Sequence, residues 1–387
     1  MSELLSLPPL SVYVHIPWCV RKCPYCDFNS HAADPDSIPV DAFVERFRQD
    51  LNQDAPLAQG RPITSVFFGG GTPSLLPAKA IGQILESLNS VIGFEPDAEI
   101  TLEANPGTFE AERFADYRAA GVNRLSIGVQ SFADRFLSVL GRIHSGDNAV
   151  QAIRQARSVG FDNLNIDLMH GLPEQSIDDA LADLNQAIDL EPTHLSWYQL
   201  TIEQNTEFYR QPPPLPAEDT LWDIQQAGQA LIDSAGYHQY EVSAYAQTDR
   251  ECRHNLNYWQ YGDFLGLGPG AHGKITRLDD AGEIIRTRKT RLPKDYLNSE
   301  RPLIRMEEAV TEVDRPFDYF INTLRLRTPV SLTHFEQMTG LSRADIAPQL
   351  DALEAKGWIK RTGDLFSTSE SGYLYLNEVL SYWLSDE

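Results

Sequence analysis

Six short apolar segments alternate with longer amphipathic stretches along the first two hundred residues of the chain. The apolar segments cover residues 11–16, 64–68, 98–103, 124–129, 163–169 and 194–200. The stretches between them place apolar residues three and four positions apart, as helices do, at 41–51, 112–120, 147–159 and 176–190. Repeated strand–helix units predict an α/β fold, either a parallel barrel or a doubly wound sheet.

Residue types that bind ligands stand at or just past the C-terminal ends of five of these segments. They are the cysteines that follow residue 16, the glycines that follow residue 68, Glu103, Gln130 and Asp167. A single residue of this kind is more often a helix cap or a turn residue. Agreement among five strand ends favours the barrel, because barrel enzymes build their sites at this end.

Three of the four cysteines, Cys19, Cys23 and Cys26, fall within eight residues of one another. Thiolates grouped this tightly suit a soft metal or an iron–sulfur cluster. A structural zinc site needs four ligands, and His31 is the only His or Cys that follows Cys26 at close range. Disulfides are disfavoured, because four cysteines in a chain of this size do not make a secreted scaffold. The spacing predicts a four-iron cluster with one iron left open.

The pattern CxxxCxxC, with Tyr25 before its last cysteine, resembles the cluster loop of radical S-adenosylmethionine (SAM) proteins. Its flanks, residues 13–19 and 27–30, are similar to the branch that contains the oxygen-independent coproporphyrinogen III oxidases and the HemW-type haem chaperones. The resemblance covers residues 11–203. It implies a partial (βα)6 barrel and a [4Fe–4S] cluster held by Cys19, Cys23 and Cys26.

A SAM site follows from the same resemblance, with the segment Gly-Gly-Gly-Thr-Pro at 69–73 beside the methionine end of SAM. The residues that it implies around SAM are Tyr13, Tyr25, Gly70, Gly71, Thr72, Glu103, Gln130, Arg142 and Asp167. Their chemistry fits, because Arg142 can pair with a carboxylate in two-pronged fashion. Glu103 and Asp167 can accept hydrogen bonds from an ammonium group or ribose hydroxyls. Successive glycines leave amides free to bond an anion.

Residues 252–259 contain the segment HNxxYW, preceded by Cys252. A His or a Cys can bind haem iron, and a Tyr–Trp pair offers flat faces to a porphyrin. The residues alone favour a plainer interpretation, in which a loop closes the open side of a partial barrel. The resemblance to HemW-type proteins implies that haem is bound by four residues, which are His254, Asn255, Tyr258 and Trp259.

The glycine-rich residues 263–273 are not a dinucleotide site, because Pro269 interrupts the GxGxxG turn and no helix opens after it. The resemblance implies a turn that lines the SAM pocket, with Ala271 and His272 facing it. A proline-rich connector, a helix and a strand that extends the sheet are expected at 211–216, 220–235 and 240–246.

The C-terminal residues predict a small winged-helix-like domain. Its expected helices cover 311–326, 332–339 and 343–356, a hairpin follows at 357–366, and an amphipathic helix closes the chain at 373–384. The expected organisation has three parts. They are a radical SAM partial barrel at 1–205, a barrel extension at 206–300 and the C-terminal domain at 301–387.

The formal net charge of −23 argues against nucleic-acid partners, because an acidic surface repels phosphate backbones. An anionic ligand such as a porphyrin must therefore meet a locally cationic surface. No apolar run is long enough to cross a bilayer, and the N-terminal residues lack the pattern of a signal peptide. The cytoplasm is the expected compartment, where reducing conditions keep thiols available for iron.

Two departures separate this chain from the oxidases that it resembles. Phe28 stands where those enzymes have a further cysteine, and Tyr13 lies almost at the start, whereas they have a longer leading segment. Both favour a haem chaperone that receives electrons from a donor and hands haem to a membrane or respiratory apoprotein. The alternative is a radical SAM oxidase that converts two propionates to vinyls. The sequence leaves open whether SAM is cleaved and whether Cys252 takes part.

Overall fold

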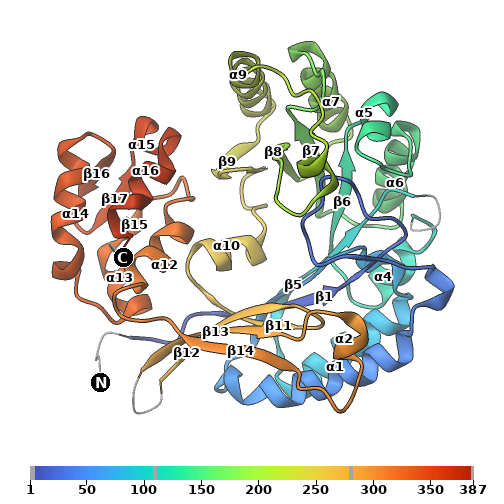
Figure 1. Cartoon of the computed structure of the whole chain (residues 1–387), viewed down its shortest axis with the longest axis horizontal. Helices are drawn as coiled ribbons and strands as arrows, with labels where there is room; N and C mark the ends of the chain where they lie inside the picture. The colour runs from blue at the N-terminus through green and yellow to red at the C-terminus, as the bar shows by residue number, and fades with distance from the viewer. Residues whose placement is uncertain (1–4, 108–110, 279–281, 385–387) are drawn as a thin grey trace.

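The computed structural model describes residues 5–107, 111–278 and 282–384 and is built around one large curved sheet (Figure 1). The sheet has twelve strands in the order β14-β13-β12-β11-β1-β4-β5-β6-β7-β8-β10-β9. Six neighbouring parallel strands form its centre. They are β1 (Leu10–Ile16), β4 (Ile63–Gly70), β5 (Phe94–Ala104), β6 (Arg124–Gln130), β7 (Leu164–His170) and β8 (His194–Gln199). These strands confirm the predicted partial barrel.

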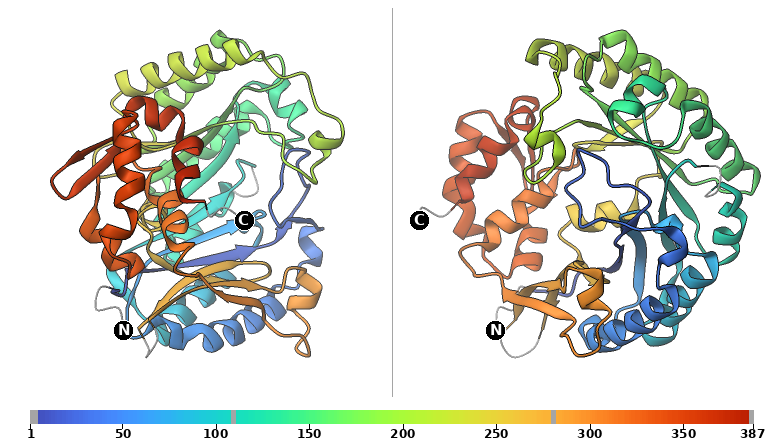
Figure 2. Two further views of the ribbon diagram at one scale, coloured as in Figure 1. Left: turned by 60° about the vertical axis from the view of Figure 1, so that its left-hand side comes forward. Right: turned by 45° about the vertical axis from the view of Figure 1, so that its right-hand side comes forward.

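Helices cover the outer, convex side of the six central strands (Figures 1 and 2). They are α1 (Val40–Asp54), α2 (Ala78–Val91), α4 (Phe114–Ala119), α5 (Asp134–Val139), α6 (Gly146–Ser158) and α7 (Ile177–Asp189). Their apolar stripes pack on side chains such as Phe68, Leu102 and Ile127, which belong to one continuous core. Ser145 and Ser176 begin α6 and α7 with capping boxes, which fixes where these helices start.

The six central strands do not close into a ring. Beyond β8 the sheet continues through an antiparallel hairpin of β10 (Ala244–Ala246) and β9 (His238–Glu241), reached through α8 (Glu207–Arg210) and α9 (Glu218–Ser234). The prediction of one strand over 240–246 was therefore wrong, since the chain reverses within that range. On the opposite edge β1 pairs with β11 instead of meeting β8.

The edge beyond β1 is extended by four strands. They are β11 (Asp263–Leu267), β12 (His272–Arg277), β13 (Glu283–Lys289) and β14 (Ile304–Ala309), with α11 (Pro293–Tyr296) between the last two. β11 runs parallel to β1, and the next three strands pair antiparallel. Because β14 belongs to this sheet, its hydrogen bonding continues past residue 300. The three-part division of the chain stays a prediction.

A smaller unit follows β14, and its apolar core also includes Leu5, Tyr261 and Ile284 from the rest of the chain. Its elements are α12 (Arg315–Thr323), β15 (Val330–Ser331), α13 (Leu332–Thr339), α14 (Arg343–Ala355), β16 (Ile359–Thr362), β17 (Leu365–Thr368), α15 (Glu370–Leu374) and α16 (Leu376–Leu380). Three helices and a hairpin agree with the winged-helix-like prediction. The helix expected at 373–384 is instead two short helices, because the backbone at Tyr375 leaves helical geometry. The helix expected at 311–326 begins only at Arg315.

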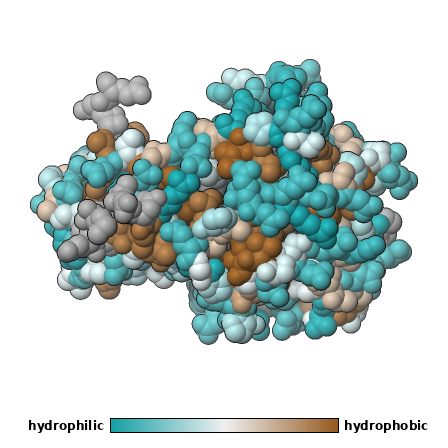
Figure 3. Space-filling view, turned by 90° about the horizontal axis from the view of Figure 1, so that it is seen from below, coloured by the Kyte–Doolittle hydropathy of each residue, from teal (hydrophilic) through white to brown (hydrophobic). Residues whose placement is uncertain are grey.

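Short 3-10 turns complete the described elements, together with a small two-stranded sheet. The turns are Pro35–Ser37, Ala55–Ala58, Pro73–Leu75 and Ser381–Trp383, and the small sheet pairs β2 (Trp18–Cys19) with β3 (His31–Ala32). Seen from below, the molecule is mostly hydrophilic, with apolar side chains gathered in a few patches (Figure 3). Within the described ranges, no helix combines the length and apolar character needed to cross a membrane.

Close packing of α9 against β8 gives a stability prediction. A Cβ at Gly228 would lie 2.1 Å from Cη2 of the buried Trp197. Gly228→Leu should lower the free energy of unfolding by roughly 1–3 kcal/mol, because the added side chain overpacks this contact. Ala230→Leu, on the exposed side of the same helix, should change it by less than about 0.5 kcal/mol. Urea unfolding curves measure both, and equal effects would contradict the packing argument.

Candidate functional site

The cysteine-bearing loop leaves the C-terminal end of β1 and crosses the open end of the barrel (Figure 2, right, dark blue). Cys19 is buried in the β2–β3 pair, and Cys23 and Cys26 lie in the turn that follows. The amide of Cys26 donates to the carbonyl of Cys23 at 3.2 Å, which fixes this turn. All three thiols are free.

The surroundings of the three thiols fit a cluster better than a single ion. Nη1 of Arg142 lies 3.8 Å from the sulfur of Cys23, and the hydroxyl of Ser30 lies 3.6 Å from that of Cys26. Such donors stabilise thiolates bound to iron. In the described parts of the chain, no three His, Cys, Asp or Glu side chains converge as ligands of one ion. A four-iron cluster needs no such point, because each thiolate binds a different iron.

Burial shapes the chemistry of these thiols. It raises the pKa of Cys19 and of Cys26, and the neighbouring sulfurs raise it further, although hydrogen bonds from Thr72 and Ser30 oppose the rise. A thiol with a raised pKa stays protonated at neutral pH unless a metal displaces its proton. The loop therefore needs a bound metal to hold Cys19 and Cys26 as thiolates.

The glycine turn after β4 lies directly against the cysteine loop. A Cβ at Gly71 would lie 2.6 Å from the carbonyl oxygen of Trp18, and one at Gly70 would lie 2.5 Å from the ring of His15. Gly70 also has a φ of +113°, which only glycine adopts without strain. These glycines thus permit two segments of backbone to meet.

The expectation that the amides of this turn stay free for an anion was wrong. Gly71 donates to the carbonyl of Ile16 at 2.7 Å, and Thr72 donates to that of Trp18 at 2.8 Å. The amide of Gly70 donates to Oε2 of Glu103 at 3.3 Å. The close approach that excludes side chains here supplies acceptors for the amides of Gly71 and Thr72, and a carboxylate of β5 accepts from Gly70.

Glu103 and Asp167 face the interior of the barrel from β5 and β7. Asn165 and Ser126 donate to the two oxygens of Asp167 at 2.7 and 3.1 Å. Burial, together with the charge of Asp167, raises the pKa of Glu103 to about 8, although the hydrogen bond from the amide of Gly70 opposes the rise. Burial raises the pKa of Asp167 as well, against the effect of its hydrogen bonds. A ligand that brings positive charge between them would favour both carboxylates in ionised form.

Arg142 and Gln130 lie on the cysteine side of the same interior. Nη2 of Arg142 donates to Oδ1 of Asn105 at 2.7 Å and to the carbonyl of Gly128 at 2.6 Å. Gln130 sits at a bulge of β6 with a φ of +70°, and its Oε1 accepts from the hydroxyl of Tyr198 at 2.7 Å. A left-handed non-glycine residue costs roughly 1 kcal/mol, and such strain gathers at binding sites.

Tyr13 and Tyr25 complete the predicted SAM set from two sides of the loop. The hydroxyl of Tyr13 lies 3.1 Å from Nδ1 of His15, and its ring stacks on Phe67. Tyr25 packs against Phe208 of α8, in the apolar cluster behind the loop. The structure thus brings all nine predicted SAM residues to the cysteine end or the interior of the barrel.

Three polar residues of this site were missed in the sequence. Asn29 donates to the carbonyls of Pro269 and Arg291, both at 2.9 Å, which ties the cysteine loop to the turn before β12. Asn105 bridges Arg142 and Thr72, and Tyr198 holds Gln130. Asn105 follows the end of β5, so the rule of polar strand ends could have found it. Asn29 and Tyr198 give no comparable signal.

The HNxxYW segment is a helix, α10 (Arg253–Trp259), and not the expected loop. His254 is 1% exposed inside the barrel, with Nδ1 3.0 Å from the hydroxyl of Ser65 and Nε2 2.9 Å from that of Tyr258. Burial, together with the charge of Arg124, lowers its pKa to about 3. Both ring nitrogens of this neutral imidazole are already engaged.

The other residues of α10 also bind the barrel. Cys252, just before the helix, donates to Oε1 of Glu99 at 3.4 Å, and Asn255 donates to the hydroxyl of Tyr240 at 3.4 Å. The guanidinium carbon of Arg325 lies over the ring of Trp259, 4.3 Å from the ring centre. This geometry supports the closing role that the residues alone had favoured for HNxxYW.

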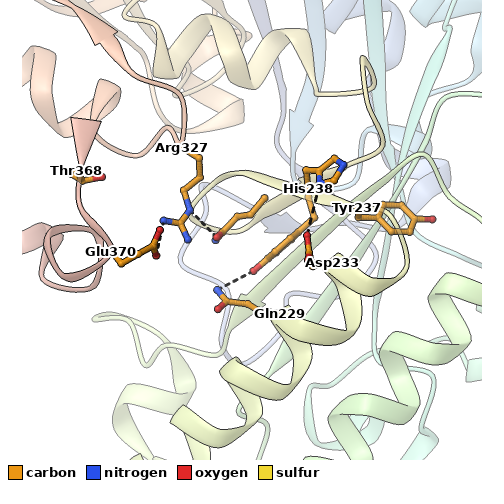
Figure 4. A pocket seen from close by; sticks show the side chains of 9 residues that line it. Gln229, Asp233, Tyr237, His238, Arg327, Thr368 and Glu370 are labelled. Carbon is orange, nitrogen blue, oxygen red and sulfur yellow. Dashed lines mark hydrogen bonds and ion pairs between the residues drawn. The ribbon is translucent and has the colours of Figure 1, made fainter. Parts of the chain in front are cut away.

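A cavity of about 440 Å³ opens elsewhere, between the β9–β10 hairpin with α9 and the C-terminal unit (Figure 4). Arg327 crosses it, donating to Gln239 at 3.0 Å and to Glu370 at 3.3 Å. None of the predicted site residues lines this cavity. Its polar residues fasten the C-terminal unit to the edge of the sheet.

Comparison with known proteins decides the family. The family described as Radical SAM superfamily matches residues 13–187, and the HemN C-terminal domain matches residues 310–375. Heme chaperone HemW of Escherichia coli (strain K12) is 49% identical over 383 residues, covering 99% of this chain and 100% of the relative. Heme chaperone HemW of Haemophilus influenzae is 50% identical over 386 residues, with 99% and 100% covered. The chain belongs to the HemW family.

HemW membership confirms the resemblance that the cysteine loop and its flanks had indicated. Radical SAM proteins have a [4Fe–4S] cluster and SAM as cofactors, and the donor set of this HemW-family chain fits both. Coproporphyrinogen III oxidase HemN from Escherichia coli shares the fold, with a TM-score of 0.81 at 24% identity over 99% of this chain and 91% of HemN.

The buried Glu103 gives a prediction about pH. Its carboxyl binds its proton more tightly in the folded than in the unfolded state, so the free energy of unfolding should fall as pH rises from about 4.5 to about 8. Glu103→Gln should flatten this fall in the ligand-free chain. Glu86→Gln, on the exposed face of α2, should leave it unchanged. Urea midpoints at pH 5 and pH 8 provide the measurement, and an unaltered fall in Glu103→Gln would refute the assignment.

Proposed function

We propose that this chain is a haem chaperone, which binds haem and hands it to apoproteins that need it. The observation that carries the proposal is identity near 50% over the full length to two proteins named heme chaperone HemW. The cysteine loop and the carboxylate-lined barrel interior support a [4Fe–4S] cluster and SAM as the resident cofactors.

The residues would divide the work as follows. Three thiols, those of Cys19, Cys23 and Cys26, would hold the cluster, which would supply one electron to the bound SAM. Glu103 and Asp167 receive the positively charged and hydroxyl-bearing parts of SAM from the barrel interior. The remaining predicted contacts, Tyr13, Tyr25, Gly70, Gly71, Thr72, Gln130 and Arg142, shape the wall beside the loop.

The second candidate function is the oxidation of coproporphyrinogen, because HemN has the same fold. Phe28 favours the chaperone, since it occupies the position of a further cysteine in the oxidases that this loop resembles. The phenyl ring of Phe28 has no donor atom for iron, and its 64% exposure shows that it is not a core residue either.

The partners follow from the proposed function. They are haem, an electron donor for the cluster, and haem-accepting apoproteins, some of them membrane-associated. The cytoplasm stays the predicted compartment. Haem binding by His254, Asn255, Tyr258 and Trp259 also stays a prediction, and it would require α10 to move, since His254 is buried and fully hydrogen-bonded.

Haem transfer tests the proposal directly. The anaerobically reconstituted chain, loaded with haem, should convert the apo form of a b-type cytochrome to its haem form, followed by absorbance. Free haemin at the same concentration is the control for spontaneous uptake. With coproporphyrinogen, SAM and a reductant, the chain should give no vinyl product. Vinyl product without stable haem binding would replace the chaperone by the oxidase.

The cluster ligands give a separate prediction. Alanine at Cys19, Cys23 or Cys26 should abolish the cluster, because a four-iron cluster on three thiolates cannot spare one. Cys252→Ala, which removes a buried thiol away from the loop, should keep about four irons per chain. Iron and sulfide analysis with electron paramagnetic resonance measures both. Tightly bound zinc, or a cluster that survives loss of a loop cysteine, would contradict the assignment.

A further inference from the structure

The C-terminal unit lies on the open side of the curved sheet, between the sheet's two extended edges (Figures 1 and 2). Its first helix, α12, is joined by a short turn to β14 at one edge. The turn that follows α12 reaches β9 at the other edge, where the amide of Arg327 donates to the carbonyl of Tyr240. The contacts that the unit makes with the two edges differ in kind.

The contact with the extension formed by β11 to β14 is apolar and buried. Tyr261 and Ile284 are 1% and 0% exposed, and they belong to the same apolar core as Tyr319 of α12. The rings of Tyr261 and Tyr319 meet edge to face, with their centres 5.3 Å apart. The amide of Val310 donates to the carbonyl of Ile284 at 2.8 Å. Separation on this side would expose apolar surface to water, so this contact holds the two parts together.

The contact with the β9–β10 hairpin is polar. Nη2 of Arg325 donates to Oε2 of Glu241 at 3.1 Å, and Nε of Arg327 donates to Oε1 of Gln239 at 3.0 Å. The backbone hydrogen bond from Arg327 to Tyr240 measures 3.0 Å. In the described parts of the chain, no apolar core cluster contains residues of both the hairpin and the C-terminal unit. We call these three hydrogen bonds the latch.

Two features of its surroundings weaken the latch. Nε of Arg325 and Nε1 of Trp259 are buried, and neither has a hydrogen-bond partner among the described residues. An unpaired buried donor destabilises the arrangement that buries it, because water would bond the same atom on exposure. Every residue that lines the 440 Å³ cavity beside Arg327 also carries a polar group, so hydrophobic burial contributes little to closure there (Figure 4).

We propose that the C-terminal unit is a lid over α10, with its hinge at the contact of Tyr261 with Tyr319 and with the latch on its opposite side. Opening the latch uncovers Trp259, because the guanidinium carbon of Arg325 lies over the ring of that residue. The hinge keeps its apolar contacts, so the unit stays folded while it moves. The use of the lid rests on the proposed function, since α10 carries the four predicted haem residues and the lid regulates access to them.

Amide hydrogen exchange of the anaerobically reconstituted chain tests the lid, because one backbone hydrogen bond crosses each contact. Glu241→Gln removes the charge of the latch carboxylate and should raise the exchange rate of the Arg327 amide at least tenfold. The Val310 amide at the hinge should keep its rate. The matched control is Glu354→Gln, which breaks an ion pair with Arg361 inside the C-terminal unit and should change neither rate.

High salt gives an independent measurement on the unaltered chain, since it screens the ion pair of the latch. It should raise the exchange rate of the Arg327 amide and leave that of the Val310 amide unchanged. Equal acceleration of both amides would show that the whole unit detaches or unfolds, which overturns the hinge. An unchanged rate at Arg327 in Glu241→Gln overturns the latch.

The rate of haemin binding separates the lid from the function. Glu241→Gln should bind haemin severalfold faster than the unaltered chain, and Glu354→Gln should bind it at the unaltered rate. Faster exchange at Arg327 without faster haemin binding overturns the role of the lid in access to α10. Failure of every form to bind haemin overturns the chaperone function and not the lid, whose motion the exchange rates report without haem.

Discussion

The failure of six parallel strands to close is the constraint on which the rest of the molecule depends. Eight strands fill a barrel with their own side chains, whereas six leave one side open. Here β8 continues into an antiparallel hairpin and β1 continues into β11, so two extended edges flank the gap. The interior must therefore be filled by segments that are not strands, and α10 and the cysteine loop do this from opposite ends.

The side chains that α10 points into the barrel are polar because the barrel side chains that they contact are polar. His254 bonds Ser65, Cys252 bonds Glu99, and Asn257 donates to Ser11 and to the carbonyl of Asp263, both at 2.8 Å. Leaving a buried polar group unpaired costs roughly 1–3 kcal/mol. The HNxxYW segment thus has a structural reason to hold these residue types, whatever else it does.

At the cysteine end of the barrel lie buried carboxylates whose ionisation costs free energy when no ligand is bound. Glu103 and Asp167 share a buried space, and their raised pKa values record the cost of holding charge there. Arg142 turns its cation toward Cys23 and Asn105, away from these carboxylates. Within the described residues neither carboxylate forms an ion pair, although the charge of Arg124 acts on Asp167. The sulfonium and ammonium groups of SAM would supply positive charge there.

The sequence predicted the centre of the fold better than its edges, for physical reasons. Strands buried on both faces, such as β1 and β7, are rich in apolar residues and end in distinctive residues. β13 and β14 were missed, because an edge that faces water carries charged residues at alternate positions, as Arg286 and Arg288 show. The helix at α10 was missed since its polar residues point into the barrel, which reverses the usual pattern.

The same reasoning explains why the cysteines and strand-end residues could be named in advance while Asn29, Tyr198 and the engaged glycine amides could not. Three clustered thiols, or a buried carboxylate, can serve few roles in a protein, so their role can be predicted from their spacing in the sequence. A side-chain amide, a phenol or a backbone N–H takes whatever partner the fold brings near. Those partners come from elements 240 or 68 residues away, as for Asn29 with Pro269 and Gln130 with Tyr198.

The two hydrogen bonds of His254 bear on whether haem binds at α10. Haem entering at His254 would displace Ser65 and Tyr258 from the imidazole and open the interior to water, so the cost of the broken hydrogen bonds would oppose binding.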